Sequence, residues 1–259
     1  MKITARINTL NEEDNIAAAL ESVVWADELL VVDAGSSDGT REVARRFTSR
    51  VVVHPFVNFG DQHHFADSQC SHEWVLVLDA DERLSPELAA AIQELRRRGA
   101  DADAYRMARR TWYLGRWIRH SGWYPDWKVR LYRRDRARWV GEIHEHAEIA
   151  GRVATLQGDI LHYTRRHLRE HVEVMNRYTG LAAAAGEGGR PISAGRLLLT
   201  PPAVFLRSYV WRQGFRDGWP GIVIAYLAAA YVHLKQAKMM ERQRLGGGAG
   251  GIRPGAGTI

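Results

Sequence analysis

The chain has 259 residues, of which 46% are hydrophobic and 25% are charged, and its formal net charge is +6. The length allows one large domain or one domain with an appendage, and this composition excludes intrinsic disorder of the whole chain. A single cysteine, Cys70, excludes an internal disulfide framework or a cysteine-cluster metal site and favours a reducing compartment. Residues 1–12 lack the apolar stretch of a secretory signal.

The charge is unevenly distributed along the chain. Residues 1–103 carry 10 basic and 19 acidic side chains, whereas residues 104–259 carry 26 basic and 11 acidic side chains. Codon usage that favours arginine would account for part of the arginine excess, but not for this asymmetry. A basic half beside an acidic half indicates a surface that meets phosphate, nucleic acid or anionic lipid.

The first hundred residues alternate between strand and helix patterns. This βαβα order predicts an α/β fold whose mostly parallel sheet has helices on both faces. Ligands of such sheets bind beyond the carboxyl ends of the strands. The predicted strands are 2–9, 28–33, 50–54 and 74–78, and the predicted helices are 15–24, 41–48, 61–68 and 86–98.

Later segments follow a different pattern. Short β-like runs, among them 128–132 and 147–149, occupy residues 105–163 together with five tryptophans. Residues 165–180 are predicted helical, the Ala/Gly-rich stretch 181–196 is predicted to be a loop, and 197–240 is amphipathic and aromatic. The uncharged run 221–234 is too short to cross a bilayer alone. We therefore expect an α/β domain over 1–165, a helical extension over 166–245 and a disordered tail over 246–259.

Two carboxylates follow the apolar run WVLVL. Asp79 and Asp81 stand two residues apart just past a predicted buried strand. A divalent cation such as Mg²⁺ or Mn²⁺ is held by few protein carboxylates together with substrate phosphates, and it stabilises a diphosphate leaving group. A D-x-D pair by itself is common among solvated surface acids, but its place after a buried strand favours a metal site.

Other polar residues follow the first two strands. Asp33 precedes the turn-rich GSSDGT, where Ser37 or Asp38 is predicted to cap a helix, and we interpret Asp33 as a ligand for a base or ribose. Thr9, Asn11 and Glu12 end the first strand. They either line the same crevice or, in the case of Asn11, cap the next helix.

A later segment, GEIHEH, places two acids and two histidines close together. In an extended chain Glu142, His144 and His146 share one face and Glu145 points to the other. A carboxylate here suits the base that a sugar-transfer enzyme needs, while each histidine is either a metal ligand or structural. In KVRLYRRDR, Arg130, Arg133 and Arg134 either clamp phosphate or are solvated strand residues. 

Together these motifs resemble a known family. NTLNEEDNI, ELLVVDAGSSDGT, WVLVLDADERL, GWYPDWKVRLYRR and GEIHEH are similar to motifs of family 2 glycosyltransferases with the GT-A fold, in particular the lipopolysaccharide-core β-1,4-glucosyltransferase-like subgroup. The resemblance covers about residues 1–165. His63 and His64, in QHHFA, replace what is more often a basic residue and Asn in relatives, and no Q-x-x-R-W signature of processive synthases is present.

The resemblance implies an inverting enzyme that transfers single hexoses from a nucleotide-sugar, of the UDP-glucose kind, to a glycan or lipid-linked acceptor in cell-envelope polysaccharide or lipopolysaccharide biosynthesis. It implies Glu145 as the catalytic base and Asp81, with Asp79, as ligands of Mg²⁺ or Mn²⁺. The resemblance further implies that the residues that contact the nucleotide-sugar are Thr9, Asn11, Glu12, Asp33, Asp79 and Arg130.

Aromatic residues interleaved with arginines between 197 and 240 predict attachment to an anionic membrane surface, on the inner face of the cytoplasmic membrane. An ordinary helical hairpin packed on the sheet or on a second subunit is the alternative. Three rival functions remain: a catalytically degenerate scaffold that binds a partner or membrane, a nucleic-acid-binding protein, and a glycoside hydrolase. The chain has no recognisable nucleic-acid motif, and a D-x-D after a parallel strand fits a metal and nucleotide better than hydrolysis.

Overall fold

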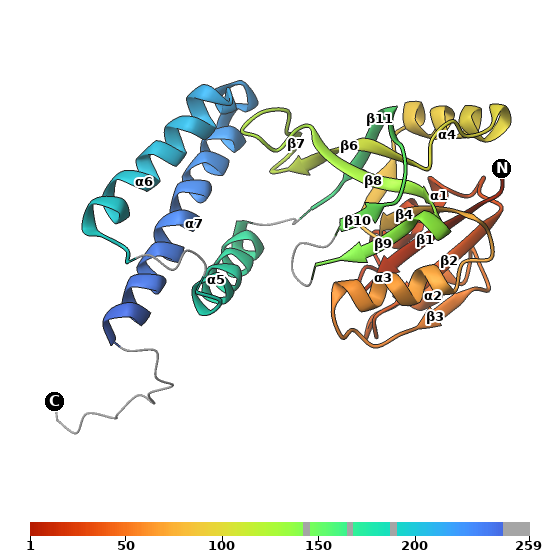
Figure 1. The fold of residues 1–259 in the computed structure, drawn as a ribbon, viewed down its shortest axis with the longest axis horizontal. Helices are drawn as coiled ribbons and strands as arrows, with labels where there is room; N and C mark the ends of the chain where they lie inside the picture. Colours follow the sequence, from red (N-terminus) through yellow and green to blue (C-terminus); the bar gives the residue numbers. More distant parts are fainter. Residues whose placement is uncertain (142–145, 165–167, 187–190, 246–259) are drawn as a thin grey trace. The chain divides into compact units, whose positions relative to one another are not determined.

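The computed structural model describes residues 1–141, 146–164, 168–186 and 191–245. The chain divides into two compact units (Figure 1). The first comprises Met1–Arg119 and Trp123–Thr164, and the second comprises His120–Gly122 and Arg165–Ile259.

A mixed nine-stranded sheet forms the centre of the first unit (Figure 1). Strands β3, β2, β1 and β4 lie side by side and parallel, and β8 joins β4 antiparallel. The order continues β8-β6-β11-β5, and β7 pairs with β6. The predicted α/β sheet is confirmed. The strands are β1 (Ile3–Thr9), β2 (Glu28–Asp33), β3 (Val51–Val53), β4 (Trp74–Asp79), β5 (Glu82–Leu84), β6 (Ala104–Tyr113), β7 (Arg116–Trp117), β8 (Asp126–Arg133) and β11 (Val153–His162), while β9 (Ala137–Val140) and β10 (His146–Ile149) form a separate pair.

Helices cover both faces of this sheet. Alternate side chains of a strand point to opposite faces, so β2 and β4 each contribute to two apolar clusters, whereas β1 directs Ile3, Ala5 and Ile7 to one face and the polar Thr4, Arg6 and Asn8 to the other. One cluster joins the sheet to α1 (Ile16–Glu21), α2 (Thr40–Ala44) and α4 (Pro86–Arg98). The other joins it to α3 (Phe59–Ser68) and to Trp139 of β9. Strands β2 and β4 are therefore buried on both sides, which explains their continuous apolar sequences.

Local sequence signals fix the ends of several helices. The side chain of Ser85 accepts a hydrogen bond from the backbone N–H of Leu88, Pro86 occupies the first turn, and Gly99 ends α4 with a φ of 88°. Asn58 caps α3 in the same way by accepting from the N–H of Asp61. Of the two alternatives for Asn11, capping of the first helix is wrong, because α1 begins at Ile16 with Asn15 at its N-cap position and without a side-chain cap.

The second unit is helical. It contains α5 (Leu168–Ala184), α6 (Ala194–Leu206), a π-helical turn η2 (Arg207–Trp211), a 3₁₀ turn η3 (Gly214–Asp217) and α7 (Gly218–Leu245). Both α5 and α6 pack against α7. The prediction of a loop over 181–196 is wrong at both of its ends. The helix α5 continues through three alanines to Ala184, because alanine is the best helix former. The next helix, α6, begins at Ala194, and the side chain of Ser193 caps it.

Within the described ranges, no helix combines the length and the apolar character that crossing a membrane requires.

Candidate active site

Strand register brings the predicted site residues to one edge of the sheet. Thr9 at the end of β1 pairs with Asp33 at the end of β2, and Asn8 pairs with Asp79 at the end of β4. Because these strands are parallel, their carboxyl ends form a single edge where a ligand can bind. The structure therefore brings together three of the predicted nucleotide-sugar contacts, which lie 24 to 70 residues apart in sequence.

Asp79 belongs to a network of charged groups. Arg130 of β8 is buried and donates hydrogen bonds from Nη2 to Asp79 Oδ2 at 2.8 Å and to Glu82 Oε1 at 3.2 Å. Arg109 of β6 donates to the same Glu82 oxygen at 3.1 Å and also pairs with Asp126. Burial alone would raise the pKa of Asp79, but Arg130 and other positive neighbours hold it well below its ordinary value. Asp79 is therefore a carboxylate at neutral pH.

Asp81 has a partner that the sequence did not indicate. Its Oδ2 lies 3.1 Å from Nε2 of His162, the last residue of β11, and Thr111 Oγ1 lies 3.4 Å from the other ring nitrogen. His162 reaches this position because it pairs with Glu82 of β5, the strand that follows the Asp79–Asp81 turn. Sequence reasoning missed Glu82, Arg109 and His162 as site residues. Their contacts join residues that stand 27 and 81 positions apart in the sequence, and only the pairing of the strands brings them together.

The donor atoms at this edge suit a divalent cation shared with a phosphate ligand. Asp79 and Asp81 supply the hard carboxylate oxygens that Mg²⁺ or Mn²⁺ prefers, and His162 places an imidazole nitrogen beside Asp81. Across the described part of the chain, no three His, Cys, Asp or Glu side chains gather as a ready metal cage. Mg²⁺ commonly takes only one or two carboxylates and completes its shell with water and substrate phosphates. The residues present thus fit a metal that arrives with a diphosphate.

Asp33 holds its own loop in place. It is fully buried, its Oδ1 accepts hydrogen bonds from the N–H groups of Gly35 and Ser36, and its Oδ2 accepts from the Ser36 hydroxyl at 2.5 Å. The carboxylate thereby fixes the turn at the carboxyl end of β2. Asp38 accepts from the N–H of Thr40 at the start of α2, but the prediction that Ser37 or Asp38 is the capping residue is wrong, because Gly39 occupies the N-cap position.

The two loops at this edge are tied together by Asn11 and its neighbour. Asn11 has a left-handed φ of 55°, its backbone N–H donates to Ser36 Oγ, and its Oδ1 accepts from the N–H of Ser37. The Glu12 backbone N–H donates to Thr40 Oγ1, and the Glu12 side chain accepts from Asn15. These contacts give the crevice a fixed wall.

Below the edge lies a buried polar network that includes His63, whereas the neighbouring His64 is exposed. Arg6 is fully buried and donates to Asp67, Tyr132 and His63 Nδ1, the last at 2.9 Å. The ring of His63 stacks on Trp139 with 3.5 Å between centroids. Burial, and next the Arg6 charge, lower the pKa of His63 to about 2. His63 is therefore neutral, with its proton on Nε2, because arginine can only donate to Nδ1.

Two further predicted candidates lie elsewhere. Arg133 pairs with Trp74, the first residue of β4, and forms ion pairs with Glu73 and Asp135, while Arg134 donates to the carbonyl of Cys70. This is the amino-terminal end of β4, at the opposite edge of the sheet from Asp79. The phosphate-clamp interpretation of Arg133 and Arg134 is therefore wrong for this crevice. Glu142, His144 and the predicted base Glu145 lie outside the described residues.

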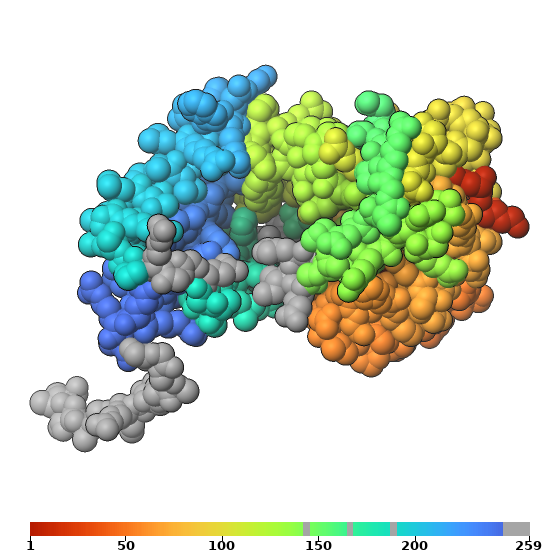
Figure 2. All heavy atoms as spheres, viewed as in Figure 1, coloured from red at the N-terminus to blue at the C-terminus, as the bar shows by residue number. Residues whose placement is uncertain are grey.

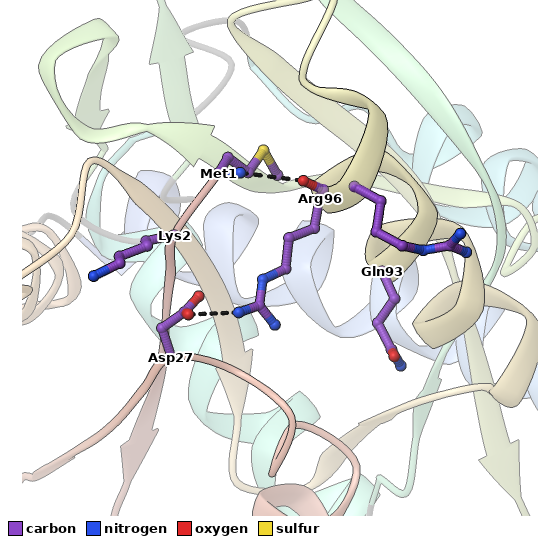
Figure 3. A pocket seen from close by; sticks show the side chains of 6 residues that line it. Met1, Lys2, Asp27, Gln93 and Arg96 are labelled. Carbon is purple, nitrogen blue, oxygen red and sulfur yellow. Dashed lines mark hydrogen bonds and ion pairs between the residues drawn. The ribbon is translucent and has the colours of Figure 1, made fainter.

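A pocket of about 540 Å³ also lies away from the site (Figure 3). It surrounds the start of β1, where the Met1 amino group donates to the carbonyl of Arg96 and the Arg96 guanidinium pairs with Asp27. It thus lies at the amino-terminal ends of the parallel strands, where ligands of such sheets do not usually bind.

Comparisons with known proteins identify the family of this chain. Residues 5–155 match the profile of glycosyl transferase family 2. Over 254 residues the chain is 30% identical to the lipopolysaccharide core biosynthesis glycosyltransferase LpsC of Rhizobium meliloti, covering 95% of this chain and 94% of LpsC. It is also 30% identical to an uncharacterized glycosyltransferase of Rickettsia typhi, covering 93% of this chain and 87% of the relative.

Two solved structures are more distant. One is residues 1–349 of TarS from S. aureus, which is 16% identical with a TM-score of 0.46 and covers 95% of this chain and 92% of that one. The other is glucosyl-3-phosphoglycerate synthase of Mycobacterium tuberculosis with Mn²⁺ and UDP-glucose, 23% identical with a TM-score of 0.37 over 42% of this chain and 44% of that one. The family profile covers more than half of the chain, and the protein belongs to glycosyl transferase family 2.

Proposed function

We propose that this protein is an inverting glycosyltransferase that moves a single hexose from a UDP-sugar, of the UDP-glucose kind, to a glycan or lipid-linked acceptor. The observation that carries the proposal is the juxtaposition of Asp79–Arg130 and Asp81–His162 at the carboxyl edge of the sheet. The name of LpsC, which the chain matches over 95% of its length, supports an acceptor in lipopolysaccharide or related cell-envelope polysaccharide biosynthesis.

Asp81, with Asp79 beside it, is proposed to hold Mg²⁺ or Mn²⁺. When bound, the cation offsets the negative charge that develops on the departing nucleoside diphosphate. Arg130 keeps Asp79 ionised and places a second positive group at the same edge. His162 orients the Asp81 carboxylate in the absence of a ligand.

The nucleotide is proposed to lie along the wall that Thr9, Asn11, Glu12 and Asp33 form. Asp33 and Asn11 contribute by fixing the loops, since their side-chain oxygens already accept hydrogen bonds from backbone N–H groups. Glu145 is proposed as the base: its carboxylate takes the proton from the acceptor hydroxyl, and the oxygen attacks the anomeric carbon on the face opposite the diphosphate. The carbon–diphosphate oxygen bond breaks, and the configuration inverts.

The enzyme is further proposed to attach to the inner face of the cytoplasmic membrane through α6, η2 and the start of α7. Figure 2 shows part of this segment, in blue, at the surface of the helical unit. No acidic residue occurs between 194 and 216, whereas Arg196, Arg207, Arg212 and Arg216 are exposed there. Basic and aromatic side chains together suit anionic headgroups and the interfacial region of a bilayer. The exposed large apolar residues are Leu198, Leu199, Leu206, Val210, Trp211, Phe215, Trp219 and Tyr226.

Asp81→Asn tests the metal–nucleotide site. The amide keeps the size of the side chain but removes the charge, so UDP binding in the presence of Mn²⁺ should weaken at least tenfold, as measured by calorimetry. Asp135→Asn, at an exposed position on the opposite edge, is the matched control and should bind like the wild type. Equal UDP affinity in Asp81→Asn and the wild type would refute the metal role of Asp81.

A further inference from the structure

Gln62 buries an amide group that has no partner. The residue, in the first turns of α3, is 4% exposed, and neither Oε1 nor Nε2 has a hydrogen-bond partner among the described residues. Buried side-chain amides are normally hydrogen-bonded, because leaving a donor and an acceptor unpaired costs free energy that an apolar side chain avoids. Such a side chain calls for a ligand that supplies both missing partners.

The contacts of α3 place this amide at the end of β2. Asp61 pairs with His54, which follows β3, while His63 contacts Asn8 of β1. On the side of the helix between Asp61 and His63, Ala66 packs in the apolar cluster that contains Leu30 and Val32 of β2. Gln62 precedes Ala66 by one helical turn on the same side of α3. Because α3 begins at the edge where the parallel strands end, Gln62 lies closer than Ala66 to the carboxyl end of β2.

That end of β2 is the wall of the proposed nucleotide crevice. Asp33 ends the strand, and both of its oxygens already accept hydrogen bonds from the Gly35–Ser36 turn. Its strand neighbour Thr9 is 5% exposed, and its hydroxyl, too, has no hydrogen-bond partner in the described ranges. Thr9 and Asp33 share the face of the sheet with Ile7 and Val31, whereas Gln62 lies on the face that α3 covers, so the unpaired hydroxyl and the unpaired amide approach the end of β2 from opposite faces.

We infer that Gln62 reads the base of the nucleotide-sugar, an inference that rests on the proposed function. A primary amide offers one acceptor and two donors in one plane. The imide edge of uracil offers an N3–H donor beside carbonyl acceptors in one plane. Gln62 Oε1 accepts from N3–H, and Nε2 donates to an adjacent carbonyl. The pair of hydrogen bonds makes Gln62 a residue that determines the specificity for the donor base.

Gln62→Met tests this assignment, because methionine has a similar length and no hydrogen-bonding amide. With Mn²⁺ present, calorimetry should show UDP bound about 10- to 100-fold more weakly by Gln62→Met than by the wild type. Gln69→Met, at the other end of α3, is the matched control and should bind UDP normally. Without nucleotide, Gln62→Met should unfold at the same temperature as the wild type or higher, since it removes an unpaired buried amide.

A modified ligand tests the same bond without any mutation. UDP methylated at N3 of uracil cannot donate from N3, so it should bind the wild type at least tenfold more weakly than UDP does. Gln62→Met should not distinguish the two ligands. CDP, ADP and GDP are measured in the same way, and the wild type should bind UDP more tightly than each of them.

The outcomes separate the inference from the proposed function. Equal UDP affinity in Gln62→Met and the wild type, or equal affinity of the wild type for UDP and its N3-methyl form, would overturn the role of Gln62 alone. A lower unfolding temperature of Gln62→Met together with unchanged UDP affinity would assign the amide to a buried water and also overturn it. A wild type that binds none of the four nucleoside diphosphates would overturn the proposed function, and the inference with it.

Discussion

Opposing electrostatic effects meet at Asp79 and at His63. Asp79 is kept ionised because Arg130 outweighs the cost of burial, whereas His63 is kept neutral because burial and Arg6 act in the same direction. The two residues stand close to the same edge, yet one supplies a fixed negative charge and the other an uncharged ring stacked on Trp139.

The neutral state of His63 has a consequence for stability. In the unfolded chain His63 takes up a proton below about pH 6.5, whereas in the folded protein it stays neutral, so stability is lost as the pH falls through 6.5. Between pH 7.5 and 5.5 this group costs about 1.4 kcal/mol of unfolding free energy. His63→Gln keeps an acceptor for Arg6 and does not titrate. Urea unfolding at pH 7.5 and 5.5 should show that the unfolding free energy of His63→Gln falls by about 1.4 kcal/mol less than that of the wild type. An equal fall in both proteins would refute the neutral state of His63 in the folded protein.

At the scale of helices and strands, hydrophobic patterns predicted most of the secondary structure of the first hundred residues. Continuous apolar runs located β2 and β4, and Ser85, Pro86 and Gly99 fixed α4 at both ends. The clustering of Thr9, Asp33 and Asp79 followed from the direction of parallel strands. The contributions of Arg109 and His162 could not be predicted, because they depend on the pairing of β6 and β11 with distant strands.

One close contact between elements can be tested directly. Gly158, beside an irregularity in β11, has a φ of 98°, and a Cβ atom there would lie 2.4 Å from the backbone nitrogen of Leu88 in α4. Gly158→Ala should lower the free energy of unfolding by about 2 kcal/mol or more, because backbone must move and the φ is unfavourable for alanine. Gly195→Ala in α6, where a Cβ meets nothing within 4 Å, should be neutral or stabilising. Equal stability of the two variants in urea unfolding would contradict this account of the contact.

At the scale of the whole molecule, the net charge of +6 hides two different halves. The acidic first half contains Asp79 and Asp81, whose proposed task is to recruit a cation that holds a diphosphate. The basic second half contains the helical unit, with its exposed arginines and apolar side chains. The charge asymmetry therefore fits an anionic, lipid-linked acceptor better than a nucleic acid.

Vesicle flotation tests the proposed membrane surface. The double variant Leu199→Ser/Trp211→Ser removes side chains that are 71% and 86% exposed. It should float at least fivefold less than the wild type with vesicles that contain anionic lipid, because it loses apolar area that would enter the interface. Val24→Ser/Val57→Ser removes exposed apolar residues of the first unit and is the control, expected to float normally. Equal flotation of all three proteins would contradict attachment through α6 and η2.

The most direct test of the central claim is the release of UDP from UDP-glucose and other UDP-hexoses, measured with Mn²⁺ and compared between the wild type and Glu145→Gln. The account predicts metal-dependent release by the wild type and a loss of 10²- to 10⁴-fold in Glu145→Gln, which should still bind UDP, because a general base contributes about that much to the rate. Parallel assays with GDP-, ADP- and dTDP-sugars should show slower release. No release from any nucleotide-sugar by the wild type, or wild-type release by Glu145→Gln, would contradict the account.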